Sequence, residues 1–118
     1  MLEKNRQLRG HDFLPANAGE VFPHLYATED TSAAEKVLHA HFFIGGMDWY
    51  LAEFSADEAV AFGWVCLGDE RDAEWGYFSL DELEDISTPF VVERDLQWVP
   101  GKASECLPER AWAWSVGR

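Results

Sequence analysis

The chain has 118 residues, of which 47% are hydrophobic and 14% aromatic, and its formal net charge is −13. This apolar content excludes a disordered polyanion and predicts one packed domain over residues 1–118. The charge disfavours direct binding to nucleic acid or to an anionic membrane, and it favours a partner with a cationic surface.

Only two cysteines are present, Cys66 and Cys106, which are too few for a disulfide framework. No apolar stretch has the length of a signal peptide's core or of a bilayer-spanning helix. We therefore expect a cytoplasmic protein. The sequence does not indicate its oligomeric state.

The first 24 residues are expected to be largely irregular, because Pro15, Gly19 and Pro23 interrupt any regular pattern. A strand is predicted over residues 37–44, with His39 and His41 on the same face, and Gly45-Gly46 follows it as a turn.

Further strands are predicted over residues 47–55, 60–67, 74–78 and 90–96. A helix is predicted to start after Ser79, because Ser79 and Glu82 have the spacing of a capping box. Short connections between strands favour an α+β fold, with an antiparallel sheet of four to five strands and a few short helices packed on one face. The tail over residues 101–118 is expected to pack on or beside the core.

Residues 62–98 combine core-type aromatic residues with ten carboxylates, and only Arg71 and Arg94 oppose them. Such a segment can hold negative charge on an ordered surface. A catalytic carboxylate pair is not expected among these residues, because helix capping explains Asp81 and Glu82, while Glu84 and Asp85 are expected to face water. The predicted partner-binding residues are Asp69, Glu70, Asp72, Glu74, Asp81, Glu82, Glu84 and Asp85.

Several blocks of the sequence together resemble the DUF2958 family. They are LYATED at 25–30, FF at 42–43, DWY at 48–50, FGWV at 62–65, EWGYFSLDELE at 74–84 and VERDLQW at 92–98. The resemblance implies a small bacterial protein that is often associated with mobile elements, and it implies no activity and no catalytic residues. The segment before LYATED and the tail after Ser104 depart from the family pattern.

The leading hypothesis is an acidic, non-enzymatic binding protein that engages the basic surface of a nucleic-acid-handling protein. Carboxylates at the charge density of DNA can pair with lysine and arginine in such a surface. Its sharper form is an inhibitor of a host defence system, an anti-CRISPR or antirestriction protein that acts as a nucleic-acid mimic. A solvated acidic surface that serves only solubility is the plainer interpretation. No cofactor is expected.

Two alternatives stay open. His39 and His41, two residues apart on a strand, have a spacing that allows both to bind one metal ion, in a metal-binding protein or a metal-dependent enzyme. Trp112 and Trp114 are the anchors of a plain protein-interaction domain if they are exposed, and core residues if they are not.

Overall fold

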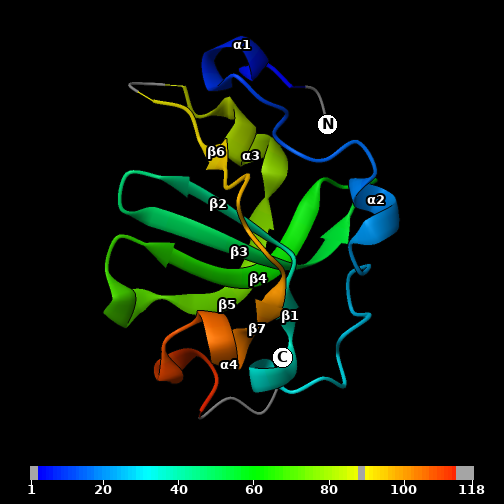
Figure 1. The fold of residues 1–118 in the computed structure, drawn as a ribbon, viewed down its shortest axis with the longest axis vertical. Coiled ribbons are helices and arrows are strands. Elements are labelled where there is room, and N and C mark those ends of the chain that lie inside the picture. The colour runs from blue at the N-terminus through cyan, green and yellow to red at the C-terminus, as the bar shows by residue number, and fades with distance from the viewer. Residues whose placement is uncertain (1–2, 88–89, 114–118) are drawn as a thin grey trace.

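The computed structural model describes residues 3–87 and 90–113, which form a central sheet with short helices around it (Figure 1). The elements, in chain order, are α1 (Arg6–Arg9), α2 (Ala18–Val21), η1 (Ala33–Glu35), β1 (Val37–Leu38), β2 (Ala40–Ile44), β3 (Met47–Ser55), β4 (Val60–Leu67), η2 (Glu70–Asp72), β5 (Glu74–Ser79), α3 (Leu80–Asp85), β6 (Glu93–Arg94), β7 (Gly101–Lys102), α4 (Ala103–Cys106) and η3 (Glu109–Ala111).

The main sheet is antiparallel and has the strand order β5-β4-β3-β2-β6, which confirms the predicted α+β fold. β3 and β4 have the predicted bounds, because turn residues flank each apolar run. The predicted fifth strand is shorter than expected, since only Glu93 and Arg94 pair with β2. β5 is therefore the longer of the two edge strands.

The predicted strand over residues 37–44 is broken at His39. Val37 and Leu38 form β1, which pairs with β7 in a separate two-stranded sheet, and β2 begins at Ala40. The break changes which way the side chains point, because Leu38 packs in a different core cluster from Ala40 and Phe42. The regular alternation expected across this segment is thus wrong.

Two hydrophobic cores lie on opposite faces of the main sheet. The first contains Trp49 and Ala61, together with Phe13 from the N-terminal segment and Leu83 of α3. The second contains Trp64 and Cys66, covered by Ala103 of α4 and by Ala111 of η3. Side chains alternate between the faces of a strand, so the almost continuous apolar run of β4 supplies both cores.

Short helices consequently cover both faces of the sheet, and the expectation that they pack on one face is wrong. α2 and α3 contribute to the first core, whereas α4 and η3 contribute to the second. From residue 3 onward the N-terminal segment is mostly irregular, with α1 and α2 as its helices, yet its Phe13 is fully buried. Figure 1 shows α1 and α3 at one end of the sheet and α4 at the other.

Helix α3 begins as the capping signal predicts. The Ser79 hydroxyl accepts a hydrogen bond from the Glu82 backbone N–H at 3.1 Å, and Leu80 and Leu83 of the helix are buried. The helix therefore leaves the end of β5 with its apolar side on the first core.

Candidate functional site

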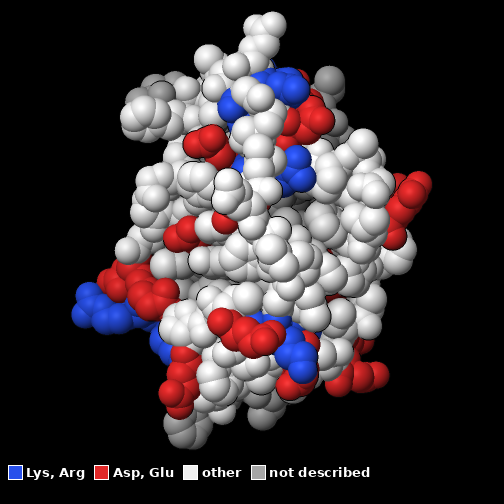
Figure 2. All heavy atoms as spheres, in the orientation of Figure 1, with Lys and Arg blue, Asp and Glu red and all other residues white. Residues whose placement is uncertain are grey.

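The predicted acidic contacts lie in two groups, one around η2 and the start of β5 and one on α3. Glu70, Asp72 and Glu74 are exposed in the first group, and Asp81, Glu82 and Asp85 are exposed in the second. On the one face of the molecule drawn in Figure 2, the carboxylates form separate groups with uncharged surface between them. On this face they do not make the single continuous band that mimicry of a DNA backbone requires.

Glu84 does not face water, and its predicted role as a surface contact is wrong. Its side chain is only 1% exposed, and its Oε2 lies 3.0 Å from Nη1 of Arg9, whose side chain is 0% exposed. Its Oε1 accepts the backbone N–H groups of Lys4 and Asn5 at 3.2 Å and 2.8 Å. The buried arginine comes from a segment far away in the sequence, so helical periodicity alone cannot reveal it.

Two further carboxylates form ion pairs at the surface. Asp69 pairs with Arg71 at 3.0 Å, and Asp85 pairs with Lys4 at 2.7 Å. The hydrogen bonds that Arg71 donates lower the pKa of Asp69. These pairs are solvent-exposed and contribute little to stability, but each partly neutralises the charge that it presents to a partner.

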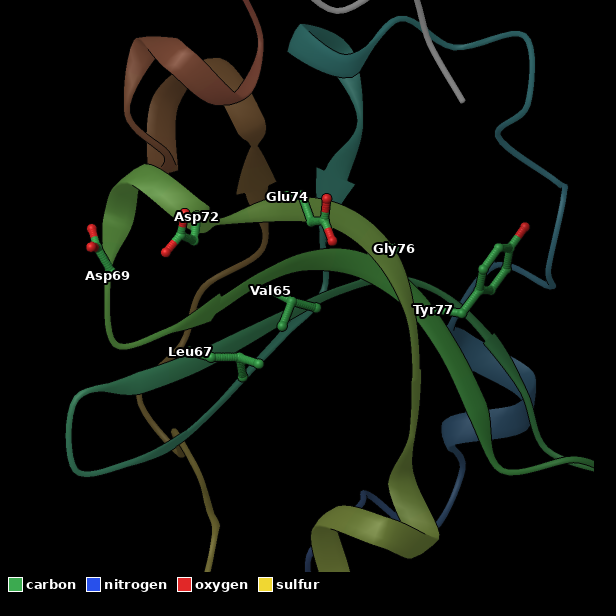
Figure 3. Close-up of a pocket in the computed structure, with 7 residues that line it drawn as sticks. All are labelled: Val65, Leu67, Asp69, Asp72, Glu74, Gly76 and Tyr77. Atoms are coloured by element: carbon green, nitrogen blue, oxygen red, sulfur yellow. The ribbon is translucent and has the colours of Figure 1, made fainter.

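A hollow of about 480 Å³ gathers part of the first acidic group (Figure 3). Val65 and Leu67 of β4 provide apolar lining, and Asp69 and Asp72 lie at one end, on and beside η2. The remaining lining residues are Glu74, Gly76 and Tyr77 of β5. The hollow thus combines an apolar surface with carboxylates at its rim, the combination that an aliphatic stem with a cationic head requires.

A second hollow of about 510 Å³ continues from the first toward α3. The two share Val65, Leu67 and Tyr77, and the second adds Glu82 of α3. Its other lining residues are Trp49, Val60, Phe78, Ser79, Leu83 and Ile86. We call the two hollows together the acidic groove. The groove brings Asp69, Asp72 and Glu74 onto one surface with Glu82, whereas it does not include Glu70, Asp81 or Asp85.

Gly76 keeps the acidic groove open. An added Cβ at this position would meet no atom within 4 Å, and its backbone does not need glycine's positive φ. A Cβ at this position would therefore project into the groove without displacing other groups. The sequence contained this glycine in the EWGYFSLDEL block, but only the tertiary structure shows that it lines one hollow together with Val65 and Leu67.

The two candidate metal-binding histidines lie against different parts of the core. The His39 ring lies 6.0 Å from that of Phe22 in the first core, whereas His41 stacks on Tyr50 with ring centroids 4.5 Å apart. The break in the strand at His39 causes this separation, so the expected shared face is wrong. Burial lowers the pKa of His39.

His41 instead joins two carboxylates. Its Nε2 lies 2.7 Å from Oδ1 of Asp48, and its Nδ1 lies 3.1 Å from Oδ2 of Asp95. The imidazole thereby connects β3 to the residues after β6. Across residues 3–87 and 90–113, no group of three or more His, Cys, Asp or Glu side chains has an arrangement that could hold a metal ion.

A buried polar network that the sequence did not indicate holds the LYATED loop. Glu53, fully buried on β3, accepts the backbone N–H groups of Tyr26 and Thr28 at 2.7 Å and 3.0 Å, and also the Thr28 hydroxyl. The buried Lys36 donates to the Thr28 carbonyl at 2.6 Å. Tyr26 has a left-handed backbone, with φ of 71°, and its ring is exposed. Strain of this kind persists only where surrounding contacts impose it.

The C-terminal tryptophan candidate that the structure describes is partly buried. Trp112 packs against the second core, and its indole N–H donates to the Leu107 carbonyl at 3.2 Å. Trp114 lies outside the described residues.

Both cysteines are free thiols, and burial raises the pKa of Cys106.

None of the helices formed by the described ranges has the length and hydropathy that a bilayer crossing requires.

Comparisons with known proteins give one result. No curated protein and no solved structure matches the chain. The family model described as "Protein of unknown function (DUF2958)" matches residues 20–106, which include LYATED, the four long strands and α3. The chain therefore belongs to the DUF2958 family.

Proposed function

We propose that this protein is a non-enzymatic binding protein whose acidic groove takes a basic segment of a partner protein. The observation that carries the proposal is the groove itself, in which Val65, Leu67 and Gly76 leave an apolar hollow beside Asp72 and Glu74. The formal net charge of −13 adds a long-range field that attracts a cationic partner and accelerates encounter.

The partner segment has a defined chemistry. Its aliphatic side chains fill the hollow, and its lysine or arginine side chains pair with the carboxylates at the rim. Nucleic-acid-handling proteins carry such basic surfaces. We therefore propose that the partner is a nucleic-acid-handling protein, and that the sharper role is inhibition of a host defence enzyme by occupying its basic surface.

The groove gathers only four of the eight predicted contacts, Asp69, Asp72, Glu74 and Glu82, which favours this local mode over imitation of a whole DNA duplex. A duplex mimic needs regularly spaced charge over a long surface, whereas a groove needs charge only at its rim. Duplex DNA added as a competitor of the natural partner tests the sharper role, and a partner that binds DNA and this protein simultaneously would contradict it.

The groove itself is tested with a probe of the proposed chemistry, a labelled peptide of about eight residues that alternates lysine and leucine. Fluorescence anisotropy measures its affinity at about 50 mM and about 300 mM salt. We expect Asp72→Asn with Glu74→Gln to weaken binding by up to about tenfold at low salt, because two rim charges are lost. Asp57→Asn with Glu58→Gln is the matched control, because it removes the same charge from the exposed connection between β3 and β4.

The apolar part of the groove has its own matched pair. Gly76→Val fills the hollow and is expected to weaken binding by about tenfold or more, since one leucine can no longer be buried. Gly46→Val adds the same side chain in the β2–β3 turn, where a Cβ also meets no atom within 4 Å. If each variant and its control change the affinity of the peptide equally, the binding is non-specific charge attraction and the proposal is overturned.

A further inference from the structure

β5 is an edge strand with only β4 beside it, among the strands formed by the described residues. The outward backbone N–H and C=O groups of an edge strand are a template for another strand. The opposite edge is occupied by β6, which has two residues, whereas β5 offers six. Glu74 and Gly76 of this same strand line the acidic groove.

The two faces of β5 offer different surfaces to an added strand. Side chains alternate along β5, so Glu74 and Gly76 lie on one face of the sheet, called here the first face, and Trp75 and Tyr77 lie on the second. The first face carries the acidic groove. On the second, the Tyr77 ring lies 5.1 Å from the buried ring of Phe62.

Tyr26 enlarges the aromatic surface on that second face. Its ring lies 6.4 Å from the Tyr77 ring, and the two residues are 57% and 49% exposed. The Glu53 hydrogen bond to the Tyr26 N–H holds this residue in its left-handed conformation. The buried Glu53 carboxylate thus helps to fix the exposed Tyr26 beside the edge strand. An exposed aromatic residue held in this way is typical of an anchor for a partner and not of a core residue.

We propose that the partner segment binds as an extended strand added to the edge of β5, an inference that rests on the proposed function of the groove. Backbone hydrogen bonds to β5 supply part of the affinity, and alternate side chains supply specificity. One set of side chains enters the acidic groove over Gly76 and Leu67. The other set lies over Tyr77 and Tyr26, whose ring faces attract lysine or arginine.

Charge decides between a partner and a second copy of the chain. Pairing two β5 strands would join two chains that each carry −13, and in antiparallel pairing the Glu74 end of each strand would lie toward the other copy's Ser79 end, which Asp81 and Glu82 follow. Like charges opposite one another destabilise strand pairing. A basic strand removes this repulsion, so the edge is suited to a cationic segment and unsuited to itself.

Backbone methylation of the lysine–leucine peptide tests strand addition directly. In an extended strand the amides of alternate residues point to opposite edges, so methylating all leucine amides blocks one edge and methylating all lysine amides blocks the other. We expect one methylated peptide to lose about tenfold or more in affinity and the other to bind within about twofold of the parent. Equal affinities for both, whether retained or lost, would overturn strand addition.

The two proposals fail differently in this experiment. If the parent peptide binds and responds to Asp72→Asn with Glu74→Gln, while the methylated peptides are equivalent, only strand addition fails. If the parent peptide does not bind, the proposed function of the groove fails. Tyr26→Gly, which suits the left-handed backbone and removes the ring, is expected to weaken the parent peptide by about threefold or more, and unchanged affinity overturns the contact with the second face. Dimers through β5 in analytical ultracentrifugation would assign the edge to a second copy instead.

Discussion

Gly63 of β4 and Gly76 of β5 are cross-strand partners with opposite surroundings. A Cβ on Gly63 would lie 1.6 Å from the Tyr50 carbonyl oxygen, whereas a Cβ on Gly76 would meet no atom within 4 Å. The first glycine allows close approach of two backbones beside the irregularity between Leu51 and Glu53. The second leaves the acidic groove open.

The difference predicts opposite effects of the same substitution. Gly63→Ala is expected to lower the free energy of unfolding by about 3 kcal/mol, because β3 must move away from β4. Gly76→Ala is expected to leave this free energy unchanged or to raise it by about 0.5–1 kcal/mol, since alanine is favoured over glycine in a strand. Urea denaturation measures both. Similar losses for the two variants would show that the groove at Gly76 is closed.

The buried Glu84–Arg9 pair predicts that substituting Glu84 lowers the free energy of unfolding strongly, although the chain as a whole has an excess of carboxylates. Glu84→Gln removes the negative charge 3.0 Å from a fully buried guanidinium, which leaves Glu3 at 3.5 Å as its remaining carboxylate partner among the described residues. We expect the free energy of unfolding to fall by about 3 kcal/mol.

Glu82→Gln on the same helix is the control for Glu84→Gln. Its side chain is exposed, so the expected change is about 0.5 kcal/mol or less. Thermal or urea unfolding of the two variants side by side distinguishes buried from surface charge, and equal stabilities would contradict the buried pair.

The left-handed backbone at Tyr26 predicts an unusual order of stabilities. Tyr26→Gly and Tyr26→Ala both remove the ring, but only glycine adopts φ of 71° without steric cost. The glycine variant is expected to be more stable than the alanine variant by about 1 kcal/mol.

Tyr77 provides the reverse control, because it lies in β5 with an ordinary strand backbone. There the alanine variant is expected to be the more stable one by about 0.5–1 kcal/mol. The same order at both positions in urea denaturation would argue against a constrained loop at Tyr26.

The raised pKa of the buried Tyr50 phenol predicts how the stability of the protein falls at alkaline pH. Burial, and then the nearby charge of Asp48, raise the pKa of Tyr50 from 10.0 to about 12. The phenol loses its proton more readily in the unfolded chain, so its contribution to stability is complete below pH 10 and is lost as the pH rises through about 12.

Absorbance titration of tyrosinate is expected to show a group with a midpoint near pH 12 that is missing from Tyr50→Phe. The same variant is expected to lose stability less steeply than the parent between pH 10 and about 12. A full set of tyrosines that titrates near pH 10 would contradict the buried phenol.

Strand and cap positions were predictable because their signals are local. Turn residues bound β3 and β4, and the Ser79–Glu82 spacing marks the start of α3. The broken strand at His39 was not predictable, since β1 pairs with β7 from a distant part of the chain. The helices on both faces follow from the double-sided apolar character of β4, whose side chains enter both cores.

The candidate site divides in the same way. Composition and charge alone indicated an acidic surface with a cationic partner, and six of the eight predicted contacts are exposed: Glu70, Asp72, Glu74, Asp81, Glu82 and Asp85. Which of them share one surface depends on the tertiary structure, which gathers Asp69, Asp72 and Glu74 around one hollow with Val65, Leu67 and Gly76.

The sequence by itself determined the excess of carboxylates, the antiparallel strands and the capped helix, because each depends on residue type or on spacings of a few positions. Only the tertiary structure decided that Glu84 is buried against Arg9 and that Gly76 opens a groove. The physical reason is that burial and close approach depend on segments far apart in the chain. The sequence alone does not distinguish a carboxylate exposed to water from one that lies beside a buried guanidinium.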